Sequence, residues 1–304
     1  MAAVISVENL RKKFGETVAL DGLSFEVGAG EMFGVIGPDG AGKTTAMRAI
    51  CGLLPADEGR VRVFGADPFR NPRKAAASIG YVSQRFSLYG DLSIDENIEF
   101  FARIHGVSHF AARRTRLLQL TGLEPFRDRL AYRLSGGMKQ KLALACTLVH
   151  EPPILVLDEP TTGVDPVSRR EFWKLLAEFI GQGLTIVLAT PYLDEAERCH
   201  RVALVAGGKL LALDAPGRLQ AAAAGALVEV VASPIRRALE VARAEVGADR
   251  VQLFGDRLHV RLDDAAGYEP VDRALATAGV DVAGWRVIPA TLEDVFIDRL
   301  AQEK

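Results

Sequence analysis

The chain has 304 residues, which suggests about two domains at roughly 150 residues per domain. Its 37 Lys and Arg residues against 39 Asp and Glu residues give a formal net charge of −2, which argues against a generally basic nucleic-acid binder. Hydrophobic residues make up 49% and charged residues 25%, a globular composition that excludes a largely disordered chain.

The cysteine spacing and the lack of a long apolar segment exclude further classes of protein. The three cysteines are widely spaced and form no CxxC pair, so we expect a reducing compartment rather than a disulfide framework or a zinc site. No stretch of 18 apolar residues occurs, and no basic region precedes an apolar one at the N-terminus. We therefore expect a chain that is soluble by itself and reaches a membrane only through a partner.

The first predicted elements are strands. Alternating apolar and polar residues predict antiparallel strands at Ile5–Leu10, Leu23–Val27 and Arg60–Phe64. Between them lies Met32–Ile36, a continuous apolar run that predicts a strand buried on both faces of a sheet. Such a run followed by a turn and a helical pattern indicates the βα alternation of an α/β domain.

A phosphate-binding loop follows that buried strand. Residues 37–44 match the pattern G-x-x-x-x-G-K-[ST] between a predicted strand and a predicted helix. Glycines allow successive backbone N–H groups to face one anion, and the helix start adds partial positive charge. Lys43 is expected to reach the phosphates of a nucleotide, and the Thr44 hydroxyl to bind Mg²⁺. The residues predicted to contact the nucleotide are Gly37, Pro38, Asp39, Gly40, Ala41, Gly42, Lys43, Thr44 and Thr45.

The next region, from about Leu92 to Val149, is predicted to be helical. Ser93 and Glu96 form a capping box at the start of a helix that runs through Phe101. Further along, Leu134–Gln140 (Leu-Ser-Gly-Gly-Met-Lys-Gln) precedes another helix. Ser135 serves there either as a simple N-cap or as part of a second anion site at an exposed helix start.

Two carboxylates end a second buried strand, Ile154–Leu157. If that strand lies beside the phosphate loop, Asp158 joins the Mg²⁺ ligands and Glu159 orients and deprotonates an attacking water. A solvated acidic turn is the alternative interpretation, which the loop upstream disfavours. A third buried strand is predicted at Thr185–Ala189.

After an Ala-rich break at residues 221–225 the pattern changes. The order β-α-β-β-α-β is typical of a small ferredoxin-like domain. Its predicted elements are Ala226–Val231, Ile235–Val246, Arg250–Leu253, Arg257–Leu262, Val271–Ala278 and Val282–Ile288. Thr291 and Asp294 are then expected to cap a last helix, Leu292–Leu300.

The phosphate loop, the Leu134–Gln140 segment and the Asp-Glu strand occur here in the order found in the ATP-binding cassette of ABC transporters, which residues 1–220 resemble. In that family Leu134–Gln140 is the signature motif. The resemblance implies an α/β P-loop NTPase fold, with a RecA-like core, an antiparallel β subdomain and a helical subdomain at about residues 92–149. A small C-terminal α+β domain, residues 221–304, is expected to be a ferredoxin-like accessory domain.

The resemblance also assigns further residues. Phe14 corresponds to the aromatic residue that stacks on adenine, with a core aromatic as the alternative. Gln84 lies in the Q-loop, where it is implied to take part in catalysis and to bind Mg²⁺ with Thr44 and Asp158; a solvated amide is its alternative. Asp165 matches the D-loop and, before Pro166, also serves as an N-cap. In the family two cassettes close head to tail, so that Ser135, Gly136 and Gly137 contact the partner's ATP.

One position departs from the family pattern. Pro191 stands where the family usually has a histidine that contacts the γ-phosphate. Proline has neither a side-chain donor nor a backbone N–H, so it cannot replace an imidazole. His200 lies nine residues further on and is expected to be a surface or helix-packing histidine. We therefore expect the site built on Lys43 to hydrolyse ATP slowly.

The resulting hypothesis is an ATPase that powers an ABC-2 type exporter, with ATP and Mg²⁺ as cofactors. The C-terminal segment Pro289–Phe296 resembles the tail of such exporter ATPases. Its partners are expected to be membrane permease subunits and a second cassette, with a heterodimer slightly favoured over a homodimer, and its place the cytoplasmic face of the cell membrane. A soluble ABC protein acting on ribosomes or DNA is one alternative. A mainly regulatory nucleotide-binding subunit is another, because of Pro191.

Overall fold

The computed structural model describes residues 3–84, 88–222, 225–264 and 267–302. The chain divides into two compact units, Met1–Ala215 and Pro216–Lys304. The division falls at Ala215 rather than at residue 220 because the short helix α8 (Pro216–Ala221) packs on α11 (Leu292–Gln302) of the second unit. Within the described residues, no helix combines the length and apolar character needed to cross a membrane.

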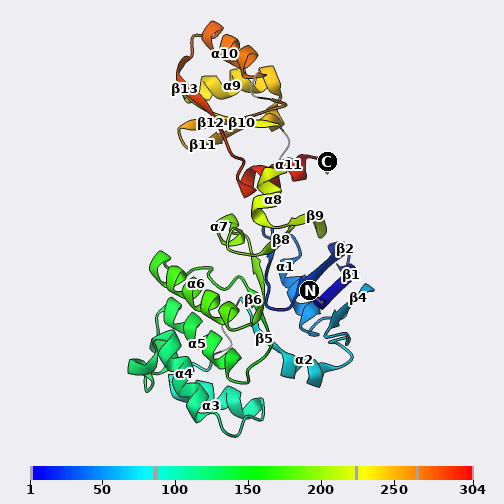
Figure 1. Ribbon diagram of the computed structural model, residues 1–304, viewed down its shortest axis with the longest axis vertical. Helices are drawn as coiled ribbons and strands as arrows, with labels where there is room; N and C mark the ends of the chain where they lie inside the picture. Colours follow the sequence, from blue (N-terminus) through cyan, green and yellow to red (C-terminus); the bar gives the residue numbers. More distant parts are fainter. Residues whose placement is uncertain (1–2, 85–87, 223–224, 265–266, 303–304) are drawn as a thin grey trace. The chain divides into compact units, whose positions relative to one another are not determined.

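A mostly parallel sheet forms the centre of the first unit (Figure 1). Its strands follow the order β5-β6-β7-β3-β8-β9, and all neighbours are parallel except β8 and β9. The strands are β3 (Met32–Ile36), β5 (Ile79–Val82), β6 (Ile154–Asp158), β7 (Thr185–Thr190), β8 (Arg201–Ala206) and β9 (Lys209–Asp214). Every residue of β3, β6 and β7 is buried, which confirms the three continuous apolar runs as interior strands.

This topology places the candidate site residues at one edge of the sheet. Because β3, β6 and β7 are parallel neighbours, their carboxyl ends meet at the same edge of the sheet. The phosphate loop leaves β3 there and enters α1 (Lys43–Ile50), while α6 (Pro166–Gly181) and α7 (Leu193–Ala196) follow β6 and β7. The residues between strand and helix in each βα unit are therefore the ones that can form a common site.

An antiparallel sheet packs beside this core, in the order β2-β1-β4. Its strands are β1 (Ala3–Phe14), β2 (Thr17–Gly28) and β4 (Glu58–Val63). Their buried alternate residues, such as Ile5, Val7 and Val61, join the hydrophobic core around α1. The three strands predicted from alternation are confirmed.

Helices make up the remainder of the first unit. They are α2 (Pro72–Ser78), α3 (Ile94–Ile104), α4 (Ala111–Thr121) and α5 (Gly136–Leu148), with short 3₁₀ turns at Glu124–Phe126 and Ala131–Arg133. Ser93 and Glu96 form the predicted capping box: the Glu96 N–H donates to Ser93 Oγ, and the Ser93 N–H to Glu96 Oε2. Figure 1 shows α3, α4 and α5 gathered apart from β1, β2 and β4.

The second unit has the β-α-β-β-α-β order. Its antiparallel sheet runs β11-β12-β10-β13, and α9 and α10 pack against one face through a core that includes Val230, Val260 and Tyr268. The elements are β10 (Ala226–Ser233), α9 (Ile235–Val246), a 3₁₀ turn (Ala248–Arg250), β11 (Val251–Phe254), β12 (Arg257–Leu262), α10 (Tyr268–Thr277) and β13 (Asp281–Ile288). Thr291 and Asp294 exchange hydrogen bonds at the start of α11, as expected for a cap.

Candidate functional site

The phosphate loop has the backbone shape that its glycines predict. Gly42, the residue before α1, has φ of 97°, and a Cβ atom there would lie 2.3 Å from the Ala19 carbonyl oxygen. Only glycine fits this position. In addition, no side chain caps the N–H groups at the start of α1, and its first turn contains no acidic residue. The helix therefore offers its N-terminus to an anion.

Lys43 links the loop to the end of β6. Its side chain is 4% exposed, and its Nζ donates to the carbonyl oxygens of Gly37 at 2.9 Å and Pro38 at 3.0 Å. The same nitrogen lies 3.3 Å from Glu159 Oε1 and 4.0 Å from the exposed Asp39 carboxylate. The Lys43 ammonium group thus lies between the phosphate loop and the Glu159 carboxylate, where it can bind phosphate oxygens.

Asp158 is fixed by two hydroxyl groups. Thr44 Oγ1 donates to Oδ1 at 3.0 Å and the Tyr81 hydroxyl to Oδ2 at 3.1 Å. The side chain is almost fully buried, and this burial raises the pKa of Asp158, with the neighbouring Glu159 charge acting in the same direction. A bound divalent cation offsets that cost, and a hydroxyl, a carboxylate and an amide oxygen are the hard ligands that Mg²⁺ prefers. Thr44, Asp158 and Gln84 therefore fit a magnesium site.

Glu159 adopts a backbone conformation that is unusual for its residue type, with φ of 50°. Its N–H donates to the Ala189 carbonyl oxygen on β7 at 2.8 Å. Its carboxylate accepts from Gln84 Nε2 at 3.0 Å and from Thr162 Oγ1 at 3.3 Å. The left-handed conformation turns this carboxylate out of the strand direction and toward Lys43 and Gln84.

The structure thus brings Lys43, Thr44, Gln84, Asp158 and Glu159 into direct contact. The remaining phosphate-loop residues lie in the same strand-to-helix connection. The sequence did not indicate two of the contacts, Tyr81 with Asp158 and Thr162 with Glu159. The signal for Tyr81 was its place three residues before Gln84, on a strand, β5, that was not predicted.

The signature residues lie at the start of α5. Ser135 is its N-cap, accepting from the Met138 N–H at 3.3 Å. Gly137 is required by packing, because a Cβ atom there would lie 2.4 Å from Ser168 Oγ on α6. Asp165 caps α6 by accepting from the N–H groups of Ser168 and Val167. Hydrogen bonds from Ser168, first from its side chain and then from its backbone, lower the pKa of Asp165. The contacts of Ser135 to Gly137 with a partner's ATP stay a prediction.

Phe14 is not a core aromatic. Its side chain is 51% exposed at the end of β1, and Lys12 Nζ lies 5.8 Å from the ring centroid. The ring is therefore not packed in a hydrophobic core. Its stacking on adenine stays a prediction.

The segment after β7 contains no imidazole near the site. Pro191 follows Thr190, whose hydroxyl oxygen accepts from the Tyr192 N–H at 3.1 Å. His200 is held elsewhere, because its Nδ1 accepts the N–H of Met32 at 2.9 Å. Met32 begins β3, and the phosphate loop leaves the other end of that strand. His200 is therefore a structural residue and does not replace the missing histidine.

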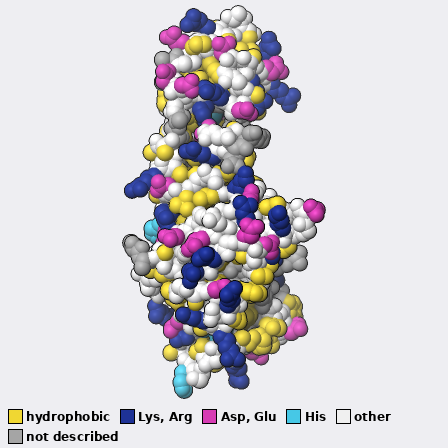
Figure 2. Space-filling model, turned by 90° about the vertical axis from the view of Figure 1, so that its right-hand side faces the viewer, with side chains coloured by type: hydrophobic (Ala, Val, Ile, Leu, Met, Phe, Trp, Pro, Cys, Tyr) yellow, Lys and Arg dark blue, Asp and Glu magenta, His cyan; other side chains and the backbone are white. Residues whose placement is uncertain are grey.

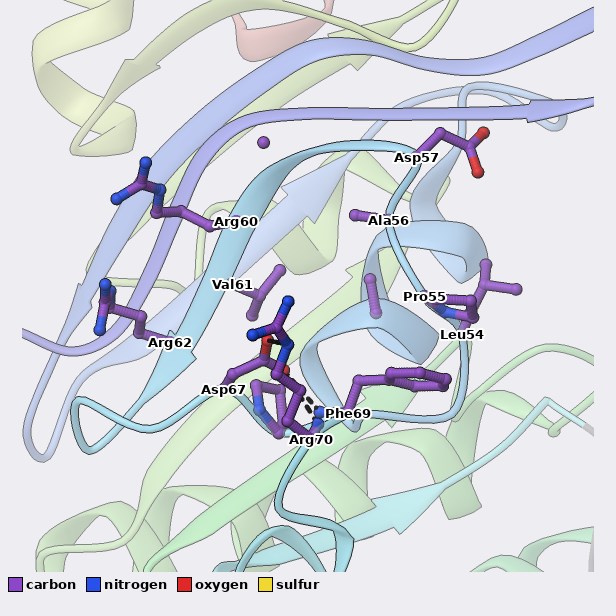
Figure 3. A pocket seen from close by; sticks show the side chains of 13 residues that line it. Leu54, Pro55, Ala56, Asp57, Arg60, Val61, Arg62, Asp67, Phe69 and Arg70 are labelled. Carbon is purple, nitrogen blue, oxygen red and sulfur yellow. Dashed lines mark hydrogen bonds and ion pairs between the residues drawn. The ribbon is translucent and has the colours of Figure 1, made fainter.

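A separate cavity of about 740 Å³ lies beside β4 (Figure 3). Leu54, Phe69 and Arg70 line it, and none of its lining residues belongs to the predicted site. Figure 3 shows Arg60 and Arg62 extending from β4 away from Leu54 and Phe69. The residues predicted to bind nucleotide lie at the loop edge of the central sheet and not in this cavity.

Comparison with known proteins agrees with this geometry. The family described as ABC transporter matches residues 20–162. Over 306 residues the chain is 38% identical to the Nod factor export ATP-binding protein I of Paraburkholderia xenovorans, covering 99% of this chain and 98% of that protein. It is 36% identical to the daunorubicin resistance ATP-binding protein DrrA2 of Streptomyces coeruleorubidus, covering 96% and 94%.

A longer relative matches about three quarters of the chain. The probable multidrug ABC transporter ATP-binding protein YbhF of Escherichia coli is 48% identical over 227 residues, which is 73% of this chain but 39% of that protein. This chain therefore spans well under half of that relative's length.

Solved structures resemble the chain over a similar portion. CbiO1 from Clostridium perfringens, described as part of the ABC transporter complex cbiONQ, has a TM-score of 0.66 and 29% identity, covering 73% of this chain and 92% of that one. A dimeric post-hydrolysis state of the cassette MJ0796, bound to ADP and Pi, has a TM-score of 0.62 and 26% identity, covering 69% and 98%.

Proposed function

Because this chain belongs to the family of ABC transporter ATP-binding proteins, whose cassettes hydrolyse ATP to power transport, we propose that it is the energy-coupling ATPase of an ABC-2 type exporter. One observation carries the proposal. Lys43 and Thr44 from the phosphate loop contact Glu159 and Asp158 at the end of β6, and Gln84 donates a hydrogen bond to the same Glu159. This arrangement combines phosphate binding, a cation site and a base at one place.

The residues divide the work as follows. The N–H groups of the loop and of the α1 N-terminus bind the phosphates, and Lys43 neutralises the terminal ones. Thr44, Asp158 and Gln84 supply the oxygen atoms that would hold Mg²⁺, which when bound neutralises charge on the phosphate oxygens. Glu159 orients a water and accepts its proton, and its hydrogen bond from Gln84 fixes the direction in which the carboxylate points.

A second cassette is part of the proposal. Ser135, Gly136 and Gly137 start α5 and are proposed to contact ATP held by the partner cassette, while Asp165 lies at the start of α6 beside them. The similarity to a cassette described as dimeric and bound to ADP and Pi supports this arrangement. Closure of the two cassettes is proposed to drive permease subunits, which places this chain on the cytoplasmic face of the membrane.

The export class rests on the relatives that match the chain along nearly its whole length. Their names refer to Nod factor export and to daunorubicin resistance. These matches include the second unit, with its capped helix α11 at Leu292–Gln302. We propose that this unit is an accessory domain, whose role is regulation or contact between cassettes.

Pro191 favours a site with weak hydrolysis. The segment offers neither an imidazole nor a backbone N–H at this position, so one contact to the γ-phosphate is missing. In a heterodimer a partner cassette with its own histidine uses the Ser135–Gly137 segment of this chain, and turnover is preserved. A mainly regulatory ATP-binding subunit is the second candidate, and the same Pro191 favours it.

The charge distribution disfavours action on ribosomes or DNA. On the face drawn in Figure 2, basic and acidic side chains are interspersed over the coloured residues rather than gathered by sign. With a net charge of −2, the chain lacks the basic excess that polyphosphate backbones require. Co-purification separates the two cases: a permease and a second cassette indicate the exporter, whereas ribosomes or nucleic acid indicate the rival.

Turnover of Mg-ATP by the purified full chain tests the proposal. Lys43→Ala removes the phosphate contact, and we expect it to lower kcat/KM by about 100-fold or more. Lys74→Ala, a change of the same type at an exposed position of α2, is the matched control and is expected to leave turnover unchanged. Full activity in Lys43→Ala would contradict the proposed function.

A further inference from the structure

Glu195, on the short helix α7, is a buried carboxylate that lies outside the phosphate and cation contacts. Its side chain is 1% exposed. Thr161 Oγ1 donates to Oε1, Thr190 Oγ1 donates to Oε2 at 2.7 Å, and Trp173 Nε1 donates to Oε1 at 3.4 Å. Arg169 Nε lies 3.2 Å from Oε1 as an ion-pair partner. Removing one partner of a buried carboxylate destabilises a protein strongly, and these partners fix the position of the Glu195 carboxylate.

The partners of Glu195 come from three segments of the first unit. Thr161 lies two residues after Glu159, in the turn that follows β6. Thr190 is the last residue of β7, directly before Pro191. Arg169 and Trp173 lie on α6. One carboxylate therefore ties the Glu159 turn, the Pro191 segment and α6 together.

Arg169 strengthens the same connection from α6. Its guanidinium stacks on the Tyr192 ring at 4.4 Å from the centroid and lies 3.6 Å from Asp194 Oδ2. Tyr192 and Asp194 belong to the segment that contains Pro191. The Arg169 guanidinium thus contacts Tyr192, which precedes α7, and both Asp194 and Glu195 within α7.

Glu159 depends on these ties because its own conformation is strained. A non-glycine residue with φ of 50° persists only when the surrounding structure holds it. Its N–H is held by the Ala189 carbonyl oxygen, and Ala189 is adjacent to Thr190. The other side of the turn is held through Thr161. Glu195 fixes both sides, through Thr161 and through Thr190.

We propose that Glu195 is a positioning residue for ATP hydrolysis, an inference that rests on the proposed function. It keeps the Glu159 carboxylate in place by anchoring the turn after β6 to the end of β7. The role matters more in this chain because Pro191 gives the segment no side-chain contact of its own with the phosphate. Glu195 acts through Thr161 and Thr190 and is not proposed to contact the nucleotide.

Two variants test the role from different sides. Glu195→Gln keeps the shape and one acceptor oxygen but removes the charge that faces Arg169. Thr161→Val is nearly isosteric and removes only the hydroxyl that donates to Glu195. We expect either change to lower kcat for Mg-ATP by about tenfold or more, because small misplacements of a catalytic group have large effects on rate. KM for ATP is expected to stay within about twofold, because the phosphate loop is untouched.

Glu171→Gln is the matched control. It makes the same substitution on α6, where the Glu171 carboxylate is exposed and paired with Lys141. It removes an ion pair of that helix without reaching the Glu159 turn, so kcat is expected to stay at the parent value. A loss of kcat equal to that of Glu195→Gln would overturn the positioning role.

Amide hydrogen exchange gives a readout that does not depend on turnover. In Glu195→Gln and Thr161→Val the Glu159 N–H is expected to exchange faster, while the N–H groups of α1 keep their protection. Unchanged kcat together with unchanged exchange at Glu159 overturns the inference and leaves the proposed ATPase intact. Absence of turnover in the parent chain contradicts the proposed function instead, and exchange at Glu159 still decides whether Glu195 positions it. If Glu195→Gln fails to fold, Thr161→Val carries both measurements.

Discussion

The environment of the Asp158 carboxyl group disfavours its ionised form. Burial raises its pKa, and hydrogen bonds from Thr44 and Tyr81 compensate only part of that effect. Its pKa is thus higher in the folded chain than in the unfolded one, where it is about 3.8. The stabilisation is therefore fully present below that value and is lost as pH rises through the folded pKa.

Asp158→Asn is therefore expected to stabilise the chain while inactivating it. The amide keeps an acceptor for the Thr44 hydroxyl without the cost of a buried charge. We expect the Tm of the first unit at pH 7 to rise by roughly 2–4 °C, the shift that about 1 kcal/mol produces in a unit of roughly 150–250 residues. Mg-ATP hydrolysis is expected to be lost. Near pH 4 the two Tm values are expected to converge. A lower Tm for Asp158→Asn at pH 7 would contradict this account of the carboxyl.

At the scale of single residues, the sequence was most informative where a motif is contiguous. Lys43, Thr44, Asp158 and Glu159 each follow a buried strand in a recognisable local pattern, and the structure brings them together. Glu195 could not be predicted in the same way. Its partners come from separate positions along the chain, and only the packing of α6 and α7 against the strand ends brings them to it.

Among the helices, α3 and α5 end at a pair of stacked imidazoles. The ring of His105, the C-cap of α3, lies 3.8 Å from that of His150, two residues after α5, at an interplanar angle of 2°. Burial lowers the pKa of His150 to about 4, and the nearby His105 and Arg113 act in the same direction. Burial also lowers the pKa of His105. Both rings therefore pack as neutral groups at neutral pH.

This pair is expected to make the first unit sensitive to acid. The unfolded state binds a proton at His150 near pH 6.5, whereas the folded state does so only near pH 4. The stabilisation is complete above pH 6.5 and is lost as pH falls through this window. His150→Phe keeps the stacking plane without the charge, and we expect it to reduce the fall in Tm between pH 7.5 and pH 5 by a few degrees, roughly 2–4 °C.

Thermal unfolding of His150→Phe and His109→Phe at the two pH values checks this. His109 is exposed and serves as the matched control, with a fall in Tm equal to that of the parent chain. A fall in Tm that is the same in His150→Phe and the parent would rule out the imidazole pair as its source.

Helices and strands were predicted correctly where the spacing of apolar residues and the length of the segment allowed only one interpretation. The strands β3, β6 and β7 read as continuous apolar runs because both faces are covered, and α9 has the predicted limits Ile235–Val246. The strands β5, β8 and β9 and the helix α2 were not predicted. The two-residue connection Gly207-Gly208 was the available signal for the β8–β9 hairpin. The Ile79–Val82 segment is too short and contains a glycine, so its strand depends on pairing with β6.

At the scale of the whole molecule, the chain combines an intact catalytic edge with one missing contact. Thr44 contacts Asp158, Lys43 and Gln84 contact Glu159, and the Ser135–Gly137 segment lies at the start of α5. Pro191 is the position at which this edge departs from the pattern expected for the family. We propose that such a cassette binds ATP and relies on a partner cassette for rapid turnover.

The most direct test of this account is the steady-state ATPase rate of the purified full chain beside that of Pro191→His. We predict slow turnover by the parent chain and a rise of about tenfold or more in Pro191→His, because the imidazole restores a donor to the γ-phosphate. Rapid turnover by the parent chain that Pro191→His does not raise would contradict the account.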